Sequence, residues 1–429
     1  MNRRPYLLIG NSAAGIGAIE GIREKDPVGE ITVVCKEPHH TYSRPLISYL
    51  LAGKVDESRM PYRPVDYYEK NHVEALLGVE ATRVDLGARA VDTSDGCSVP
   101  FEKLLIATGG RPIIPRDVEG AEAKGVFTFT TWDDVRRIQE FMEENDVTDA
   151  LVVGGGLIGL KSVEALSALN VRAVVVELAD RLMSVTFDQT ASNLAQRALE
   201  RAGVEVRCGT TVTRIERVHG RVAGALLRDG SKIECRMVIL AIGVTPNIDL
   251  VQGTEIGADR GIVVDDYMQT SVEGVYAAGD VAQAVDLLGG EKRPIAILPN
   301  AYRQGRIAGI NMAGGRRSFE GGLAMNAVDI CGLPTISVGV TVPNGEDCEV
   351  LSNLDEKAPV YRKLVLKGGR IIGAIFVGEI DRAGIVTGLI RDKVEVTGFK
   401  DLLLTDGFGL ISLPADYRKH VVSGAGIEV

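Results

Sequence analysis

The chain has 429 residues, of which 45% are hydrophobic, 25% charged and 5% aromatic, a length that predicts roughly three domains at about 150 residues each. Its 48 lysines and arginines against 58 aspartates and glutamates give a net charge of −10, which argues against binding to nucleic acid or to an anionic membrane surface. No apolar run reaches the roughly 18 residues needed to cross a bilayer, so we expect a cytoplasmic protein with no membrane partner.

The first elements of the chain are those of a βαβ unit. We expect a strand over Tyr6–Gly10, a turn of small residues over Gly10–Gly15, a helix running through Ile22 and a second strand over Ile31–Val34. A strand, a tight turn, a helix and a strand in this order are typical of dinucleotide-binding folds.

The same order of elements returns near the middle of the chain. A strand over Ala150–Val153 leads into the turn Gly154–Gly159, a helix through Leu169 and a strand over Val171–Val176. Because only this one unit repeats, the chain is not a solenoid. Two such units predict an α/β fold with two Rossmann-like domains.

Outside these units we expect two antiparallel ribbons and three buried strands. The ribbons are Arg83–Cys97 and Val212–Ile233, and the strands are Lys103–Gly109, Met237–Gly243 and Gly274–Ala278. The tail, from residue 321 on, has no phosphate-binding loop and is expected to be a separate α+β domain. Its strand-like stretches, which precede two helical ones, are Ile336–Val342, Tyr361–Leu366 and Ile371–Val377.

The second turn carries the complete fingerprint of a loop that holds a nucleotide diphosphate. A strand, turn and helix offer free N–H groups and the positive end of a helix, and glycines let the backbone approach the phosphates. Glu177 ends the following strand, where a carboxylate accepts hydrogen bonds from ribose hydroxyls. No arginine cluster follows to hold a 2′-phosphate, so NAD is favoured, although Arg181 keeps NADP open. The residues predicted to bind NAD(H) are Gly154, Gly156, Leu157, Ile158, Gly159, Glu177 and Gly243.

The first turn is a weaker form of the same motif. Ser12 takes the position of the second glycine, so a pyrophosphate would meet a small polar side chain. Cys35 stands where the strand-end acid is expected, and Glu37 lies two residues later. Taken alone, this turn leaves a ligand-free structural role open.

A third element favours a second dinucleotide. Asp280 follows a buried strand, at the edge of the sheet where doubly wound folds bind ligands, although an aspartate there can also simply cap a helix. Combined with Ala107-Thr108-Gly109 and the first glycine turn, it resembles the FAD signature of two-dinucleotide flavoproteins. In those proteins the corresponding aspartate hydrogen-bonds the ribitol and phosphate region of the flavin.

From Tyr6 to about Met312 the chain resembles the pyridine nucleotide–disulfide oxidoreductase family of FAD- and NAD(P)H-dependent enzymes. Within that family, Tyr42–Leu46 and Gly156–Lys161 are most similar to NADH:rubredoxin reductases and to the flavin domains of NADH-dependent nitrite reductases. Leu298–Ala301 and the Gln304-Gly305 pair match the turn and helix beside the flavin in that branch.

The resemblance implies three domains and a set of flavin contacts. Residues 1–118 and 243–320 would form a discontinuous FAD-binding domain, residues 119–242 the NAD(H)-binding domain and residues 321–429 an α+β interface domain. Arg44 and Pro45 would line the FAD site, and Ala81 would meet the adenine through its backbone. The residues predicted to bind FAD are Gly10, Ser12, Ala14, Gly15, Glu37, Arg44, Pro45, Ala81, Ala107, Thr108, Gly109, Gly279, Asp280 and Pro299.

Two departures from the family pattern bear on mechanism. Disulfide reductases and their single-cysteine relatives carry a redox cysteine after the first unit, whereas Thr41–Gly53 contains none. Cys35 falls in the strand and is expected to be a buried thiol. Lys161 stands where many relatives have a glutamate that faces the flavin; a cation there would tune the flavin, the alternative being a solvated helix face.

Metal chemistry is not expected. None of the six cysteines lies within four residues of another, and the five histidines lack metal-ligand spacing. Of the remaining candidates, His39 and His40 are expected to lie in a loop flanking the FAD site, and Trp132 to pack at a helix start.

The leading hypothesis is a flavoenzyme that exchanges a hydride between NADH and FAD and passes electrons to or from a protein partner such as rubredoxin, ferredoxin or an iron–sulfur subunit. It would be a free reductase, a homodimer, or the NAD-reactive subunit of a hetero-oligomer. Two alternatives remain: an NADH oxidase that uses oxygen or a small acceptor, and a scaffold subunit that retains FAD without turnover.

Overall fold

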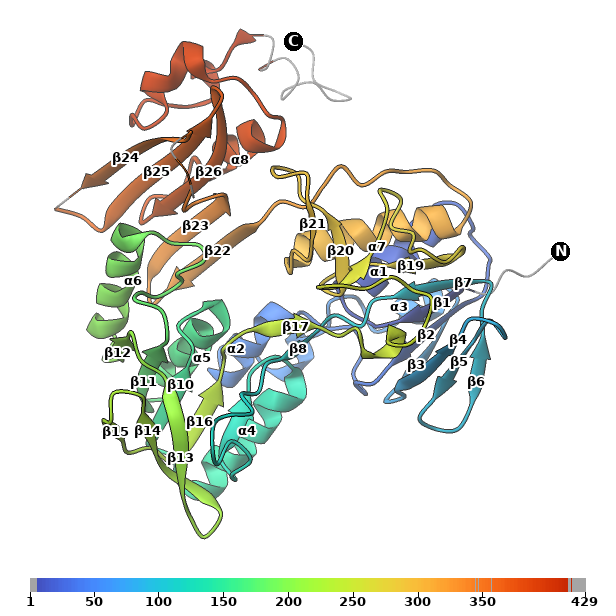
Figure 1. The fold of residues 1–429 in the computed structure, drawn as a ribbon, viewed down its shortest axis with the longest axis horizontal. Helices are drawn as coiled ribbons and strands as arrows, with labels where there is room; N and C mark the ends of the chain where they lie inside the picture. Colours follow the sequence, from blue (N-terminus) through green and yellow to red (C-terminus); the bar gives the residue numbers. More distant parts are fainter. Residues whose placement is uncertain (1–5, 344, 346, 356, 416–417, 419–429) are drawn as a thin grey trace. The chain divides into compact units, whose positions relative to one another are not determined.

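The computed structural model describes residues 6–343, 345, 347–355, 357–415 and 418. They fall into two compact units (Figure 1). The first comprises Met1–Gly154, Ile158–Ala173 and Thr211–Leu323, and the second comprises Gly155–Leu157, Val174–Thr210 and Ala324–Val429. The boundaries of the three domains inferred from the sequence stay a prediction.

The centre of the first unit is a five-stranded parallel sheet in the order β19-β7-β1-β2-β3. Its strands are β1 (Tyr6–Ile9), β2 (Ile31–Cys35), β3 (Val73–Leu77), β7 (Lys103–Ile106) and β19 (Val275–Ala277). Every residue of β1 is buried, because this strand has neighbours on both sides and layers on both faces. Carboxyl ends of parallel strands meet at one edge, so the residues that follow β1, β7 and β19 are brought together.

Two helices pack closely beside this sheet, α1 (Ala13–Arg23) and α7 (Leu298–Met312), as Figure 1 shows. Side chains at Gly17 and Gly21 would overlap the backbone of α7 at Tyr302 and Arg306. Small residues on α1 and α7 therefore let the two backbones touch, and this contact fixes α7 against the first turn.

The second parallel layer of this unit contains β10 (Asp149–Val153), β16 (Met237–Leu240) and β9 (Val126–Thr128). The turn after β10 leads into α5 (Leu157–Ala168), and α4 (Trp132–Asn145) follows β9. Both predicted βαβ starts are present.

Shorter strands and helices complete the first unit. The predicted ribbon at Arg83–Cys97 is a three-stranded antiparallel sheet of β4 (Ala81–Asp85), β5 (Ala90–Thr93) and β6 (Ser98–Pro100). The second predicted ribbon is β13 (Val212–Val218), β14 (Arg221–Leu227) and β15 (Lys232–Ile233). The other strands are β8 (Gly110–Pro112), β17 (Val244–Pro246), β18 (Ile262–Val263), β20 (Ala282–Val285) and β21 (Lys292–Arg293). The short helices are α2 (Ile47–Leu51) and α3 (Tyr67–Lys70), with 3₁₀ turns at Arg44–Leu46, Glu57–Arg59 and Asp249–Val251.

In the second unit, β11 (Arg172–Glu177) runs parallel to β12 (Glu205–Cys208), with α6 (Gln189–Arg201) between them in sequence. The C-terminal part is an antiparallel sheet in the order β22-β23-β26-β25-β24. Its strands are β22 (Met325–Ile330), β23 (Leu333–Gly339), β24 (Glu349–Asp355), β25 (Val360–Lys367) and β26 (Arg370–Val377), followed by α8 (Ala383–Arg391) and 3₁₀ turns at Thr397–Leu402 and Leu410–Ser412.

The sequence-based description of this tail was incomplete. The edge strands β22 and β24 were not anticipated, and the strand expected at Ile336–Val342 begins earlier, at Leu333. Six of the seven residues of β24 are exposed, so the strand lacks the alternation of buried and exposed residues that marks a half-buried strand. Of the two helical stretches expected, α8 is an α-helix, whereas Thr397–Leu402 is a 3₁₀ turn.

Candidate active site

The first glycine turn is closed tightly against the end of β7. Gly10 has a φ of +116°, which favours glycine, and a Cβ there would overlap the carbonyl oxygen of Ala107. A Cβ at Gly15 would overlap the carbonyl oxygen of Gly10, so the helix begins directly on the turn. Ser12 caps α1 without a side-chain hydrogen bond, and no acidic side chain lies in the first turn of the helix. Amide groups and the helix dipole are thus available to an anion, as a pyrophosphate requires.

Asp280 lies after β19, at the same edge of the sheet. Its neighbour Gly279 donates its amide to Gln304 Oε1 at 2.8 Å, and a Cβ on Gly279 would lie 3.2 Å from that of Ala14. Burial raises the pKa of the Asp280 carboxyl, and the charge of Arg44 opposes that shift. Among the described residues its side chain forms no hydrogen bond. A partly buried carboxylate needs donors, and the hydroxyls of a sugar-phosphate chain such as that of FAD would supply them.

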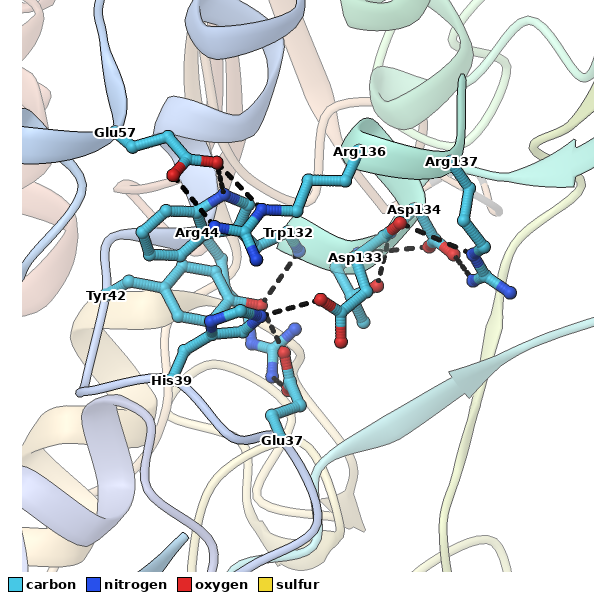
Figure 2. Close-up of polar contacts among 11 residues, drawn as sticks. Glu37, His39, Tyr42, Arg44, Glu57, Trp132, Asp133, Asp134, Arg136 and Arg137 are labelled. Carbon is cyan, nitrogen blue, oxygen red and sulfur yellow. Dashed lines mark hydrogen bonds and ion pairs between the residues drawn. The ribbon is translucent and has the colours of Figure 1, made fainter. Parts of the chain in front are cut away.

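Three further residues that were assigned to FAD, Glu37, Arg44 and Pro45, follow β2 in the chain. Glu37 accepts a hydrogen bond from the hydroxyl of Tyr42 at 2.6 Å and pairs with Arg44, as Figure 2 shows. Burial disfavours the charged guanidinium, but Tyr42 and Glu37 outweigh it and raise the pKa of Arg44. Arg44 therefore stays charged and also donates to the carbonyl of Thr130 at 3.0 Å. Pro45 follows in the 3₁₀ turn that leads to α2.

The remaining assigned residues lie near this edge. Val79, two residues before Ala81, donates its amide to the carbonyl of Cys35 at 3.0 Å. The hydroxyl of Thr108 is engaged with the carbonyl of Asn247 at 2.8 Å. Pro299 stands in the first turn of α7, where proline costs no hydrogen bond.

A network that the sequence did not reveal joins the flavin-side loop to the start of α4 (Figure 2). The ring of His39 stacks on Trp132 with centroids 4.6 Å apart, and its Nε2 lies 2.7 Å from Asp133. The indole N–H of Trp132 donates to Glu57 at 3.2 Å, and Arg136 pairs with the same carboxylate. The helix start itself, expected at Trp132, is closed by a capping box between Thr131 and Asp134.

A second network of hydrogen bonds, also not anticipated from the sequence, holds Asn11 in the first glycine turn. The hydroxyl of Tyr68 donates to Asn11 Oδ1 at 2.6 Å and accepts from the amide of Thr41 at 3.0 Å. Asn11 in turn donates to the carbonyl of His39 at 3.3 Å. The only sequence signal for these contacts was the position of Asn11 inside the glycine motif.

The second glycine turn repeats the geometry of the first. Gly154 has a φ of +112°, and a Cβ there would overlap the carbonyl oxygen of Ala241, which follows β16. A Cβ at Gly159 would overlap the carbonyl oxygen of Gly154. In both turns, therefore, the first glycine lies against the carbonyl that follows a neighbouring strand, and the last glycine lies against the carbonyl of the first. Gly243, also assigned to NAD, lies beyond β16 and accepts the amide of Ile113 through its carbonyl at 3.0 Å.

Glu177, at the end of β11, is positioned by the backbone of the second unit. One carboxylate oxygen accepts the amide of Gly155 at 2.6 Å, and the other accepts the amide of Ala179 at 2.8 Å. A Cβ on Gly156 would meet nothing within 4 Å, so its turn is open. Each carboxylate oxygen retains acceptor capacity, which suits recognition of ribose hydroxyls.

Lys161, on α5, does not lie on a solvated helix face. Its side chain is 18% exposed, pairs with Glu164 one turn on, and places its Nζ 5.3 Å from the ring centre of Tyr49. Lys54 Nζ lies 3.7 Å from the same carboxylate and 5.8 Å from the same ring centre. These residues line one small hollow with Ser48. The effect of Lys161 on the flavin stays a prediction.

The cysteines and the metal-ligating side chains were the subject of two further expectations from the sequence. All six cysteines are free in the described residues, and burial raises the pKa of the half-buried Cys35 thiol, which disfavours the reactive thiolate. No group of histidine, cysteine and acidic side chains in the described part of the chain could hold a metal ion. In the same residues, none of the helices combines the length and apolar character that crossing a membrane requires.

Two closed glycine turns, each at the carboxyl edge of parallel strands, with a partly buried aspartate at the first and a backbone-held glutamate at the second, define a flavoprotein with two dinucleotide-binding sites. The family model for pyridine nucleotide-disulphide oxidoreductases matches residues 4–305, and a rubredoxin NAD⁺ reductase C-terminal domain matches residues 325–394. The chain belongs to the pyridine nucleotide-disulphide oxidoreductase family. It is an oxidoreductase whose cofactors are FAD and NAD(H).

Three curated relatives bear on the branch. The chain is 34% identical over 398 residues to subunit epsilon of the NADH-dependent phenylglyoxylate dehydrogenase of Aromatoleum evansii, covering 91% of this chain and 92% of the relative. It is 30% identical to the rubredoxin-NAD(+) reductase of Pseudomonas putida, covering 72% and 80%. It is also 30% identical to the nitrite reductase [NAD(P)H] of Bacillus subtilis, where it covers 92% of itself but only 48% of the relative.

Among solved structures, the NAD-dependent persulfide reductase from A. fulgidus superposes with a TM-score of 0.85 at 30% identity. The match covers 94% of this chain and 79% of that one. The comparisons confirm the α/β fold, the family and the cofactors expected from the sequence.

Proposed function

We propose that this chain takes a hydride from NADH onto FAD and passes the electrons to a protein redox partner, as the NAD-reactive flavin subunit of a larger complex. The observation that carries the proposal is the pair of matching glycine turns, one beside Asp280 and the other followed by Glu177. FAD, when bound, accepts the two electrons of a hydride together and can release them one at a time.

The side chains around the two turns bind and orient rather than exchange protons. The amides at the start of α1 would bind the pyrophosphate, and the Asp280 carboxylate is available to hydroxyl donors. Arg44, kept charged by Tyr42 and Glu37, supplies a fixed positive charge on the flavin side. Glu177 orients the ribose of NADH. Hydride transfer needs no protein acid or base, so these roles suffice.

The partner is proposed to be a one-electron carrier or an iron–sulfur subunit. The segment Thr41–Gly53 contains no cysteine, and burial disfavours ionisation of the Cys35 thiol. In the described residues, electrons would therefore pass from the flavin to the partner without a cysteine intermediate. The near full-length similarity to a subunit of an NADH-dependent dehydrogenase and the similarity to a rubredoxin reductase both support a protein partner. Light scattering of the purified protein would show whether the chain also forms a homodimer. Six free cysteines support a reducing, cytoplasmic setting.

An anaerobic titration of the FAD-loaded chain with NADH tests the proposal. NADH should bleach the flavin absorbance, and oxidised rubredoxin or ferredoxin should restore it faster than oxygen does. Faster recovery with oxygen alone would indicate an oxidase instead. Flavin that NADH does not bleach would indicate a scaffold subunit. Co-purification of the tagged chain from its native host would then show which polypeptides accompany it.

A further inference from the structure

A single loop connects the ribose carboxylate of Glu177 to the C-terminal sheet within the second unit. The loop covers residues 178–187; Leu178 and Val185 are exposed, whereas its middle is buried and hydrogen-bonded. Met183 donates its amide to the carbonyl of Gly155 at 2.9 Å, and Leu182 is fully buried against Gly155. Arg181 donates to the carbonyls of Phe187 and Ser184, at 3.2 Å each, so its guanidinium spans the loop.

The loop ends at Asp188, which makes two kinds of contact. One carboxylate oxygen caps α6 by accepting the amide of Ala191 at 3.0 Å. The other accepts the hydroxyl of Tyr361 at 2.7 Å and Lys363 Nζ at 2.9 Å. Tyr361 and Lys363 stand two residues apart on β25, so they point to the same face of the C-terminal sheet.

This contact is buried and charged. The side chain of Lys363 is 8% exposed and that of Asp188 19% exposed. Burial opposes ionisation of Asp188, but the Ala191 amide, Lys363 and Tyr361 outweigh it and hold the pKa of this carboxyl below its usual value. Removing one partner of a buried pair is costly because it leaves the other charge uncompensated. The loop is therefore fixed at one end by the glycine turn and at the other by the C-terminal sheet.

Asp188 is contacted from one face of β25 only, as the residue between Tyr361 and Lys363 shows. Arg362, between the two residues, pairs with Glu379 and Asp406 and donates to the carbonyl of Leu404 at 3.3 Å. All of these partners belong to the C-terminal part itself. Only Tyr361 and Lys363 among these three residues reach the loop behind the ribose site.

We propose that Tyr361 and Lys363 are positioning residues for NADH: by holding Asp188, the C-terminal sheet sets the geometry of the loop that begins at Glu177, and with it the affinity for NADH. The inference rests on the proposed function, because it places the ribose of NADH at Glu177. It makes the C-terminal domain part of the nucleotide site. A partner that binds this domain and displaces β25 would change the affinity for NADH. Because coupling between sites is reciprocal, NADH would change the affinity for that partner by the same factor.

The test uses the full-length, FAD-loaded chain and the variants Lys363→Met, Tyr361→Phe and Asp188→Asn. Asparagine caps helices about as well as aspartate, so the third variant removes the charge and keeps the cap. Rapid mixing with NADH yields a dissociation constant for NADH and a limiting rate of flavin reduction. We expect the dissociation constant to rise about fivefold or more, as a coupling of 1 kcal/mol or more requires, while the limiting rate and the flavin spectrum stay as in the wild type.

Lys400→Met is the matched control, because Lys400 pairs with Glu349 in the same domain but at an exposed site. It should leave the dissociation constant unchanged. Thermal unfolding of each variant checks the fold, and if Lys363→Met does not fold, the milder Tyr361→Phe decides the question. Folded variants that bind NADH as the wild type does would overturn the inference. Wild-type flavin that NADH fails to bleach would overturn the proposed function instead, so the two failures are distinguishable.

Discussion

The two glycine turns are built alike, but the glutamate that follows each of them in the chain is held in a different way. In both, the first glycine has a positive φ and approaches the carbonyl after a neighbouring strand, Ala107 in one case and Ala241 in the other. The acid that follows the first turn, Glu37, is bound by side chains, whereas Glu177 is bound by backbone amides. Glu37, which bonds to Tyr42 and Arg44, contributes to a charged network beside the proposed FAD site. An acid held by amides keeps a fixed position for a ligand that binds and leaves.

The largest expected effect comes from adding a methyl group at either turn. Gly10→Ala should yield protein without FAD, since its Cβ would overlap the Ala107 carbonyl. Gly154→Ala should retain FAD but lose bleaching by NADH, because its Cβ would overlap the Ala241 carbonyl. Flavin content by absorbance and anaerobic NADH titration separate the two variants. If both lost FAD, the assignment of one cofactor to each turn would be wrong.

A smaller effect is expected from the acid of the second turn. Glu177→Gln keeps the size of the side chain but removes its charge, and hydrogen bonds to a charged group contribute about 1.5–3 kcal/mol. The dissociation constant for NADH should therefore rise by roughly ten- to a hundredfold, and the preference of the site for NADH over NADPH should weaken. Glu37→Gln is the matched variant and should leave NADH affinity unchanged. Equal effects of both substitutions on NADH binding would contradict the difference drawn between the two acids.

The charge on α5 gives a third, intermediate test. Lys161→Ala removes a cation that is paired with Glu164, and we expect a more negative flavin midpoint potential because a nearby positive charge favours the reduced, more negative flavin. A shift of about 30 mV corresponds to about 1.4 kcal/mol for a two-electron couple. Lys54→Ala, which removes the second cation near Glu164, serves as the comparison. An unchanged potential in Lys161→Ala would remove Lys161 from the flavin site.

The smallest effect is expected in the network of Figure 2. Trp132→Phe keeps an aromatic ring against His39 but removes the donor to Glu57. A typical hydrogen bond contributes about 1 kcal/mol, so the melting temperature should fall by a few degrees. Cofactor content and NADH affinity should not change. A loss of FAD in this variant would mean that the network holds the flavin loop as well as α4.

The glycine turns, the strands of the first sheet and the acid at Glu177 could be predicted because each is encoded locally. Fully apolar runs such as that of β1 mark strands buried on both faces, and positive-φ turns demand glycine. The edge strand β24 could not be predicted, because an exposed strand has no hydrophobic pattern.

Contacts between distant segments were equally beyond reach from the sequence. The bond from Arg44 to Thr130 and the pairing of Asp188 with Lys363 join residues far apart in the chain. Neither Asp188 nor Lys363 belongs to a motif, and a lysine in a strand ordinarily indicates an exposed position. Such residues become visible only when the fold brings them together.

The contact between α1 and α7 has a consequence for how the protein is made. Gly17 and Gly21 seat α7 directly on α1, and β19 joins the first sheet beside β7. Both late elements are synthesised after the whole segment that contains the second glycine turn. Since a growing chain folds as its parts emerge from the ribosome, the flavin half cannot close before Met312 has been added. FAD can therefore be held in a complete site only after α7 has emerged from the ribosome.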